Sequence, residues 1–186
     1  MGELENKFIK IIESDKELIE VLKIVRDINL PDVFVGAGAI RNLVWDVLHN
    51  YSKRTPVKDI DVAYFDSLDI SPEKDLEIYK ELSRVNTNFK WNVFNQARSH
   101  IKNSLKTPAN STKEGISHWI EIPTCTGVRL NRDNSFSVCA PYGLYDLMNL
   151  IVRPIPGVNR KMDVYKKRIQ EKKWKENWPK LKIFYD

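Results

Sequence analysis

The chain has 186 residues, of which 42% are hydrophobic and 30% charged. This composition is typical of a soluble globular protein and excludes long disorder, and no apolar run approaches the roughly 20 residues of a membrane helix. The formal net charge of +5 is uneven: residues 153–186 carry 11 basic and 4 acidic side chains, whereas residues 1–152 carry 19 and 21. The basic character therefore belongs to the C-terminal segment.

The two cysteines, Cys125 and Cys139, are too few for a disulfide framework or a zinc site. They could pair if their strands were neighbours, but free buried thiols are favoured, which indicates a reducing, cytoplasmic setting. The N-terminal residues, MGELENKFIK, resemble neither a secretory signal nor a myristoylation signal. We therefore expect a cytoplasmic protein without a membrane partner.

The first half of the chain alternates helical and strand-like patterns. Apolar spacing over Glu3–Ile28 predicts two helices, divided by a capping-box pattern at Ser14–Glu17. The following elements are a short strand at Val33–Val35, a glycine turn, a helix at Ala39–His49, a strand at Asp59–Phe65 and a helix at Ser71–Arg84.

The second half predicts fewer regular elements. They are a strand at 88–95, a capping-box helix at 111–119, a hairpin at 126–141, a helix at 142–152, a basic helix at 162–177 and a strand or docked tail at 181–184. This order favours an α/β (α+β) fold with a mixed β-sheet flanked by helices and a C-terminal basic helix. We expect one domain over residues 1–186, with an N-terminal helical segment (1–30) and a docked basic C-terminal segment (153–186).

Two aspartates interrupt a strand that otherwise looks buried. Side chains two residues apart on a strand share a face, so Asp59 and Asp61 point together while Ile60 points to the core. Adjacent carboxylates repel unless a cation lies between them, and Mg²⁺ commonly takes one or two carboxylates together with substrate phosphates. The spacing therefore predicts a divalent-metal clamp for a nucleoside triphosphate.

A glycine turn precedes this strand by one helix. Gly36 and Gly38 can adopt conformations closed to other residues and leave room for a phosphate. The turn leads directly into a helix, whose first N–H groups can bind an anion. The order of glycine turn, helix, basic loop and Asp-x-Asp strand is far more specific than Asp-x-Asp alone.

These residues carry a family resemblance. GAGAIRN (36–42) followed by KDIDVAYFD (58–66) resembles the nucleotidyltransferase superfamily that includes polymerase β and the CCA-adding enzymes. More narrowly, WNVFNQARSH, TCTGVRL, APYGLYDL, IVRP and KKWKENWPKL resemble a small bacterial nucleotidyltransferase-like family, over about residues 20–184. The resemblance implies that an NTP donates its nucleoside monophosphate to a hydroxyl, with Mg²⁺ as cofactor and space for two metals.

The resemblance also implies roles for single residues. Ala37 and Gly38 occupy the two glycine positions, and Asp59 and Asp61 occupy the metal positions. An alanine is tolerated at position 37 if its φ angle stays negative. The superfamily's third carboxylate falls at Asn92, which can ligate a metal but cannot act as a base. Glu121 is the nearest alternative acid, although Pro123 places it at the end of an element.

Basic residues near the pattern have two interpretations. Arg41 could bind phosphate or pair with Asp46 or Asp59, and Arg98 could bind a triphosphate or belong to a helix surface. The loop before the Asp-x-Asp strand contains three more basic residues. They could guide an anionic acceptor, although a solvated loop is the simpler interpretation. These are Lys53, Arg54 and Lys58.

The C-terminal segment from Lys161 to Lys182 mixes basic residues with aromatic ones. The aromatic side chains there and just beyond are Tyr165, Trp174, Trp178 and Phe184. Such a mixture could bind single-stranded nucleic acid, or the aromatics could dock the segment on the core. The three histidines, His49, His100 and His118, lack metal-ligand spacing, and no nucleophile–base arrangement supports a hydrolase.

Three functions remain open from the sequence. The leading hypothesis is a nucleotidyltransferase in which Gly36, Ala37, Gly38, Arg41 and Arg98 contact the nucleotide and Asp59, Asp61 and Asn92 the metal. The alternatives are a nucleotide-binding pseudoenzyme, because of Asn92, and a nucleic-acid-binding module using the basic tail. The sequence leaves the base and the acceptor, whether RNA, protein or small molecule, undetermined.

Overall fold

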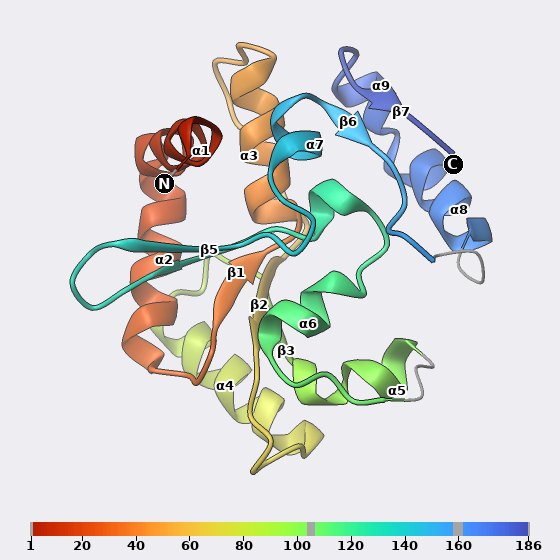
Figure 1. Cartoon of the computed structure of the whole chain (residues 1–186). Coiled ribbons are helices and arrows are strands. Elements are labelled where there is room, and N and C mark those ends of the chain that lie inside the picture. Colours follow the sequence, from red (N-terminus) through yellow and green to blue (C-terminus); the bar gives the residue numbers. More distant parts are fainter. Residues whose placement is uncertain (1, 104–106, 158–161, 186) are drawn as a thin grey trace.

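The computed structural model describes residues 2–103, 107–157 and 162–185, and its centre is a mixed five-stranded sheet (Figure 1). The strand order is β3-β2-β1-β4-β5; β2 and β3 are parallel, and the other neighbours are antiparallel. The strands are β1 (Phe34–Gly36), β2 (Ile60–Tyr64), β3 (Trp91–Asn95), β4 (Gly127–Leu130) and β5 (Phe136–Cys139). The expected mixed sheet and the hairpin of β4 and β5 are confirmed.

One face of the sheet carries the main core. Val35, Ile60 and Val62 point to this face and are buried in one cluster with many apolar side chains, among them those of the first four helices of the chain. These helices are α1 (Glu3–Ser14), α2 (Lys16–Ile28), α3 (Gly38–Leu48) and α4 (Pro72–Val85). Every second residue of β2 (Ile60, Val62 and Tyr64) belongs to this cluster, which is the alternation that its sequence predicted.

The opposite face carries a smaller apolar cluster. Phe34 and Ala63 pack there with Ile116 and with the free, buried thiols of Cys125 and Cys139. Burial raises the pKa of the Cys125 thiol well above its usual value. The covering elements include α6 (Thr112–Ser117) and the 3₁₀ turn at Ile122–Thr124, and Figure 1 shows α6 across the sheet from α2. A second 3₁₀ turn at Gln96–Arg98 contacts α6 and leads into α5 (Ser99–Asn103).

The break between α1 and α2 is where it was predicted, but its cap is a different residue. Asp15 is the N-cap of α2, and its carboxylate accepts a hydrogen bond of 2.7 Å from the N–H of Leu18. The hydroxyl of Ser14 instead donates back to the carbonyl of Ile11, inside α1. Asp and Ser are similarly good caps, so a sequence with both side by side does not fix the choice.

Two helices expected near the C-terminus are shorter than predicted. The helix expected over 142–152 is only α7 (Tyr145–Met148), because Leu150 adopts a φ of 59° and the chain then enters β6 (Ile151–Val152). The single basic helix expected over 162–177 is not confirmed: α8 (Met162–Lys172) and α9 (Trp174–Asn177) are separated by Lys173, whose φ is 48°. Lys161 lies outside the described residues.

The C-terminal segment contacts helix α3 through buried aromatic rings. Trp45 makes edge-to-face contacts with Trp174 and Trp178, at centroid distances of 5.5 and 5.1 Å. Tyr165 is also buried, and its hydroxyl donates to the carbonyl of Phe184, beyond β7 (Lys182–Ile183), which pairs with β6. These three buried rings on α8, α9 and the residue after α9 cannot stack on nucleic-acid bases, so they support the docking interpretation.

None of the helices in the described residues has the length and apolar character needed to cross a bilayer. The expectation of one domain over the whole chain stays a prediction.

Asp46 joins three parts of the chain. Its buried carboxylate accepts hydrogen bonds of 2.7 Å from the backbone N–H and hydroxyl of Thr55 and from the indole N–H of Trp178.

We expect Asp46→Ala to leave these donors unpaired and to lower the free energy of unfolding by about 3 kcal/mol in chemical denaturation. Asp27→Ala, at a side chain that is 66% exposed, is the control and should change it by less than about 0.5 kcal/mol.

Candidate active site

Strand register aligns three residues across the sheet. Asp61 of β2 pairs with Gly36 of β1 on one side and with Asn92 of β3 on the other. Directly paired residues share a face, so all three belong to the face opposite the main core. A Cβ atom on Gly36 would lie 2.9 Å from the Trp119 ring and 3.0 Å from the carbonyl oxygen of Thr126, so only glycine fits there.

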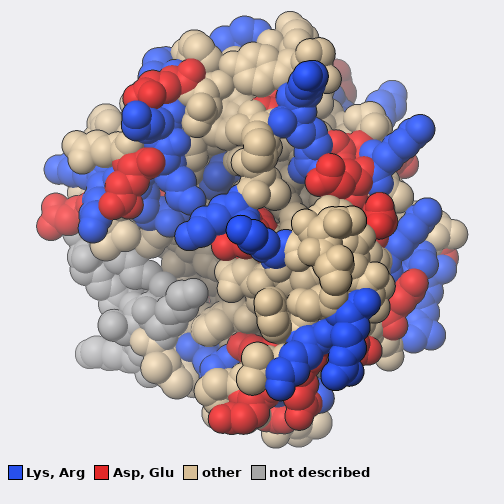
Figure 2. Space-filling view, turned by 180° about the vertical axis from the view of Figure 1, so that it is seen from behind, with Lys and Arg blue, Asp and Glu red and all other residues tan. Residues whose placement is uncertain are grey.

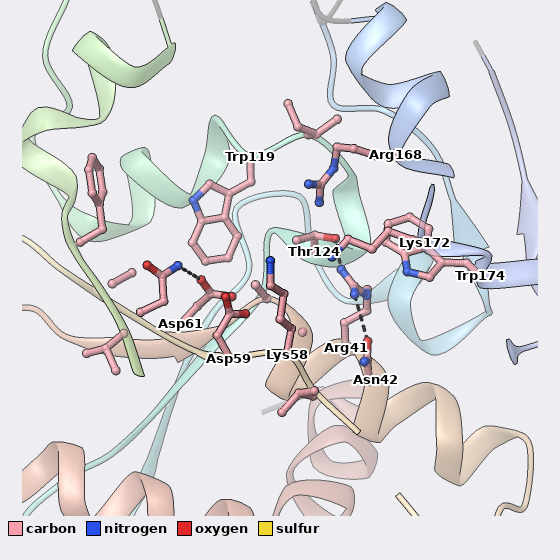
Figure 3. A pocket seen from close by; sticks show the side chains of 18 of the residues that line it. Arg41, Asn42, Lys58, Asp59, Asp61, Trp119, Thr124, Arg168, Lys172 and Trp174 are labelled. Atoms are coloured by element: carbon pink, nitrogen blue, oxygen red, sulfur yellow. Dashed lines mark hydrogen bonds between the residues drawn. The ribbon is translucent and has the colours of Figure 1, made fainter. Parts of the chain in front are cut away.

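A cavity of about 630 Å³ opens beside this row. Figure 3 shows Asp59 and Asp61 side by side on its wall, with the Lys58 amino group and the Trp119 ring close to them. Most of the residues predicted from the sequence line this cavity: Ala37, Gly38, Arg41, Asp59, Asp61 and Asn92. Gly36 lies next to the cavity, within β1.

The third-carboxylate position contributes an amide that hydrogen-bonds the second aspartate. The Asn92 side-chain N–H group donates to Asp61 Oδ1 over 2.7 Å (Figure 3). Among the described residues no three His, Cys, Asp or Glu side chains group as metal ligands, so the cavity offers a carboxylate pair. Two carboxylates with phosphate or water oxygens suit one Mg²⁺ ion, whereas a second ion would lack its usual charged ligand.

The turn before α3 holds an alanine in a conformation that favours glycine. Ala37 has φ 49° and ψ −122°, so the condition of a negative φ, under which an alanine is readily tolerated there, is not met. Its N–H donates to the carbonyl of Thr126 over 3.2 Å, and its carbonyl accepts the first helical bond of α3, from Arg41 N at 2.9 Å. The turn is therefore held at both peptide groups, and the strain is stored beside the cavity.

Arg41 is buried at the start of α3 and faces the cavity. Its guanidinium donates to Thr124 Oγ1 over 2.7 Å and to Asn42 Oδ1 over 2.9 Å, rather than to Asp46 or Asp59. It also lies against the ring of Trp174, 4.5 Å from its centroid. Burial is the main cause that lowers the pKa of Arg41 to about 10, so the charge is costly to desolvate there but is kept at neutral pH.

Two other candidates have partners of their own. Glu121 is fully buried and lies outside the cavity lining; Arg168 donates to its two oxygens, over 2.5 and 3.2 Å. Arg98 also lies outside the lining, ion-paired with Asp75 and with its guanidinium 5.0 Å from the Phe94 ring centroid. The structure therefore does not bring Glu121 to the carboxylate pair or Arg98 to the cavity.

The three basic residues of the loop before β2 also differ in their surroundings. Arg54 pairs with Asp15 over 3.1 Å, Lys53 is exposed, and Lys58 lines the cavity. The cavity also has lining residues that the sequence pattern did not identify: Trp119, Thr124, Arg168 and Lys172. Trp119 and Arg168 lie outside the stretches that carry the family resemblance. Thr124 and Lys172 lie in TCTGVRL and KKWKENWPKL, but these stretches assigned them no role, so only the fold shows that they line the cavity.

The chain belongs to a nucleotidyltransferase family, whose sequence model matches residues 23–183. One solved protein, described as revealing a CCA-adding enzyme head domain, is 31% identical with a TM-score of 0.83, over 96% of this chain and 95% of its own. No curated protein matches this chain.

Longer enzymes share the fold at low identity. A CCA-adding enzyme in complex with CTP is 12% identical (TM-score 0.62; 98% of this chain, 43% of its own). The Thermotoga maritima CCA-adding enzyme in complex with tRNA is 14% identical (TM-score 0.61; 98% and 42%). The chain thus spans about two fifths of the length of these two enzymes, and the likeness to them shows the fold alone.

The strain at Ala37 can be measured with a matched pair of substitutions. We expect Ala37→Gly to raise the free energy of unfolding by about 1 kcal/mol, because glycine relieves the positive φ. Ala39→Gly, two residues on within α3, should lower it by about 1 kcal/mol, because it adds backbone freedom in the helix and removes a buried methyl. Chemical denaturation of both variants checks the opposite signs; a loss of stability in Ala37→Gly would contradict the strain.

Proposed function

We propose that this chain is a Mg²⁺-dependent nucleotidyltransferase that transfers a nucleoside monophosphate from an NTP to an acceptor hydroxyl. The observation that supports it most is the joint position of Asp59 and Asp61 on the wall of a cavity that also holds the turn at Ala37 and Gly38. Membership of a nucleotidyltransferase family supports the same reaction class.

In this proposal Asp59 and Asp61 hold the metal ion. Bound Mg²⁺ would neutralise charge on the phosphates and polarise the phosphorus that is attacked. Gly38 and the following N–H groups of α3 bind phosphate oxygens, and the space beyond Gly38 allows this because no atom lies within 4 Å of where its Cβ would be. Arg41, in the first turn of the same helix, adds a fixed positive charge beside them.

The acceptor is expected on the β3 side of the aspartates. If the phosphates bind at the start of α3, an in-line attack on the α-phosphate comes from the opposite side of the metal, over Asn92. Asn92 cannot take the proton of the attacking hydroxyl, so we expect slower turnover than with a third carboxylate. Solved relatives include complexes with CTP, ATP and tRNA, which makes NTPs and RNA the first substrates to test.

A second candidate function is nucleotide binding without turnover. The Asn92 amide, hydrogen-bonded to Asp61, favours it, because the site then has two carboxylates where catalysis of this class uses three. Both candidates predict NTP binding with Mg²⁺, and only the first predicts a transferred nucleotide.

A transfer assay distinguishes them. Purified protein and Mg²⁺ are incubated with each α-labelled NTP and with RNA, total cell protein or small hydroxyl compounds as acceptors. We expect label transfer that falls more than about 100-fold in Asp61→Asn, because one metal ligand is lost. Asp27→Asn, at an exposed site, is the control and should match the parent. Binding of an NTP without any transfer would instead support the second candidate.

Substituting Asn92 tests the metal site without an assay of turnover. We expect Asn92→Asp to lower the melting temperature without metal, because its carboxylate replaces a hydrogen bond to Asp61 by repulsion. Added Mg²⁺ should then stabilise this variant more than the parent, by about 1.4 kcal/mol for a tenfold gain in affinity. Asn92→Ala, which adds no charge, is the control. An equal effect of Mg²⁺ on all three proteins would argue against a metal at Asp59 and Asp61.

A further inference from the structure

The C-terminal helix α8 contributes two cations to the cavity. Arg168 and Lys172 are four residues apart, so they lie on the same side of the helix, and both line the cavity. Figure 3 shows them with Arg41 of α3 across the cavity from Asp59 and Asp61. We refer to Arg41, Arg168 and Lys172 as the cationic wall.

Glu121 fixes the first of these cations. Arg168 uses Nε and one of its two terminal nitrogens to bind the fully buried Glu121 carboxylate. The Arg168 side chain is still 31% exposed, and its second terminal nitrogen remains to donate to a ligand. A bidentate pair of this kind restricts the guanidinium plane, so the free edge of Arg168 has a defined direction.

The cationic wall holds three positive charges close together, and Asp59 and Asp61 act on it only through space, from across the cavity. Glu121 is the carboxylate that directly contacts it, against three cations. The cations also affect one another: burial, followed by the charges of Arg168 and Arg41, lowers the pKa of Lys172. Like charges held together in a partly buried site indicate an anionic ligand.

Arg41 supplies a second, independent sign of a missing partner. The residue is only 5% exposed, yet its Nε atom has no hydrogen-bond partner among the described residues. Leaving a buried charged donor unpaired costs free energy unless a ligand or water satisfies it.

On the face seen in Figure 2, Lys and Arg side chains also border a hollow of the surface, where they are interspersed with acidic ones.

We propose that the cationic wall is the subsite for the two terminal phosphates of the nucleotide, and that Glu121 is the residue that positions Arg168 for them. This inference rests on the proposed function, because it assumes that the α-phosphate lies at Asp59 and Asp61. Oxygens of the β- and γ-phosphates then meet guanidinium and ammonium donors, which pair well with them. Helix α8 therefore determines the preference for a triphosphate over a monophosphate.

Inorganic pyrophosphate, without metal, is the first probe. It represents the two terminal phosphates and does not depend on a base or on Mg²⁺ at the aspartates. We expect the parent to bind it and Arg168→Gln to bind it about 10- to 100-fold more weakly in titration calorimetry, since a charge-assisted contact is lost. Lys167→Gln is the matched control, because its side chain on the same helix is 73% exposed and outside the cavity lining. It should change affinity less than twofold.

The second measurement is the ratio of the affinities for a nucleoside triphosphate and the monophosphate of the same base, with Mg²⁺. We expect Arg168→Gln to reduce this ratio at least tenfold and Glu121→Gln to reduce it by a smaller factor, with little change in monophosphate affinity. General damage to the fold would weaken both ligands alike. Arg168→Lys keeps the charge but loses the planar guanidinium that can form two parallel hydrogen bonds, so its affinity ratio should lie between those of the parent and Arg168→Gln. Thermal unfolding confirms that each variant is folded.

The outcomes separate this inference from the proposed function. If Arg168→Gln and Lys167→Gln bind pyrophosphate and triphosphate equally well, the cationic wall is not the phosphate subsite, whatever the parent catalyses. Failure of the parent to bind pyrophosphate would overturn the inference as well. If the parent binds pyrophosphate through Arg168 but no NTP binds with Mg²⁺, the anion subsite stands and the proposed function falls.

Discussion

The pairing of Asp61 between Gly36 and Asn92 is the constraint on which the candidate site depends. Because side chains alternate along β2, the same register buries Ile60 and Val62 in the main core. A shift of one residue would bring Asp61 into the apolar core and Ile60 to the cavity, at a cost far larger than any local contact. The hydrophobic effect on one face of the sheet therefore determines the position of a carboxylate on the other.

Docking of the C-terminal segment is a second constraint, and it acts over a long sequence separation. The indole N–H of Trp178 donates to Asp46, and the Trp45 ring packs between Trp174 and Trp178. Trp174 and Trp178 line part of the cavity, as do Arg168 and Lys172 of the same segment. The apolar and aromatic contacts supply the stability, so the cations can stay close together despite their repulsion.

The sequence predicted the parts of this site that depend on local periodicity. Asp59 and Asp61 were identifiable because a period of two places them opposite Ile60 and Val62. The sequence did not predict that Asp15 rather than Ser14 is the cap, nor that Ala37 has a positive φ, because several residue types can satisfy the same local pattern. The role of α8 could not be predicted either, because the contact between Glu121 and Arg168 joins residues 47 positions apart and neither belongs to a motif.

The amide at position 92 and the pairing of Glu121 with Arg168 can be explained together. Position 92 has an amide where the superfamily pattern has a carboxylate, and the buried Glu121 binds Arg168 instead of facing the aspartates. In the proposed function, one divalent ion would already neutralise the two aspartates on the metal side of the cavity. A second ion would add charge that no carboxylate balances, so the terminal phosphates need another source of positive charge. If the terminal phosphates bind at Arg41, Arg168 and Lys172 as proposed, these fixed side-chain cations would supply that charge, and the site would use one metal ion in place of two.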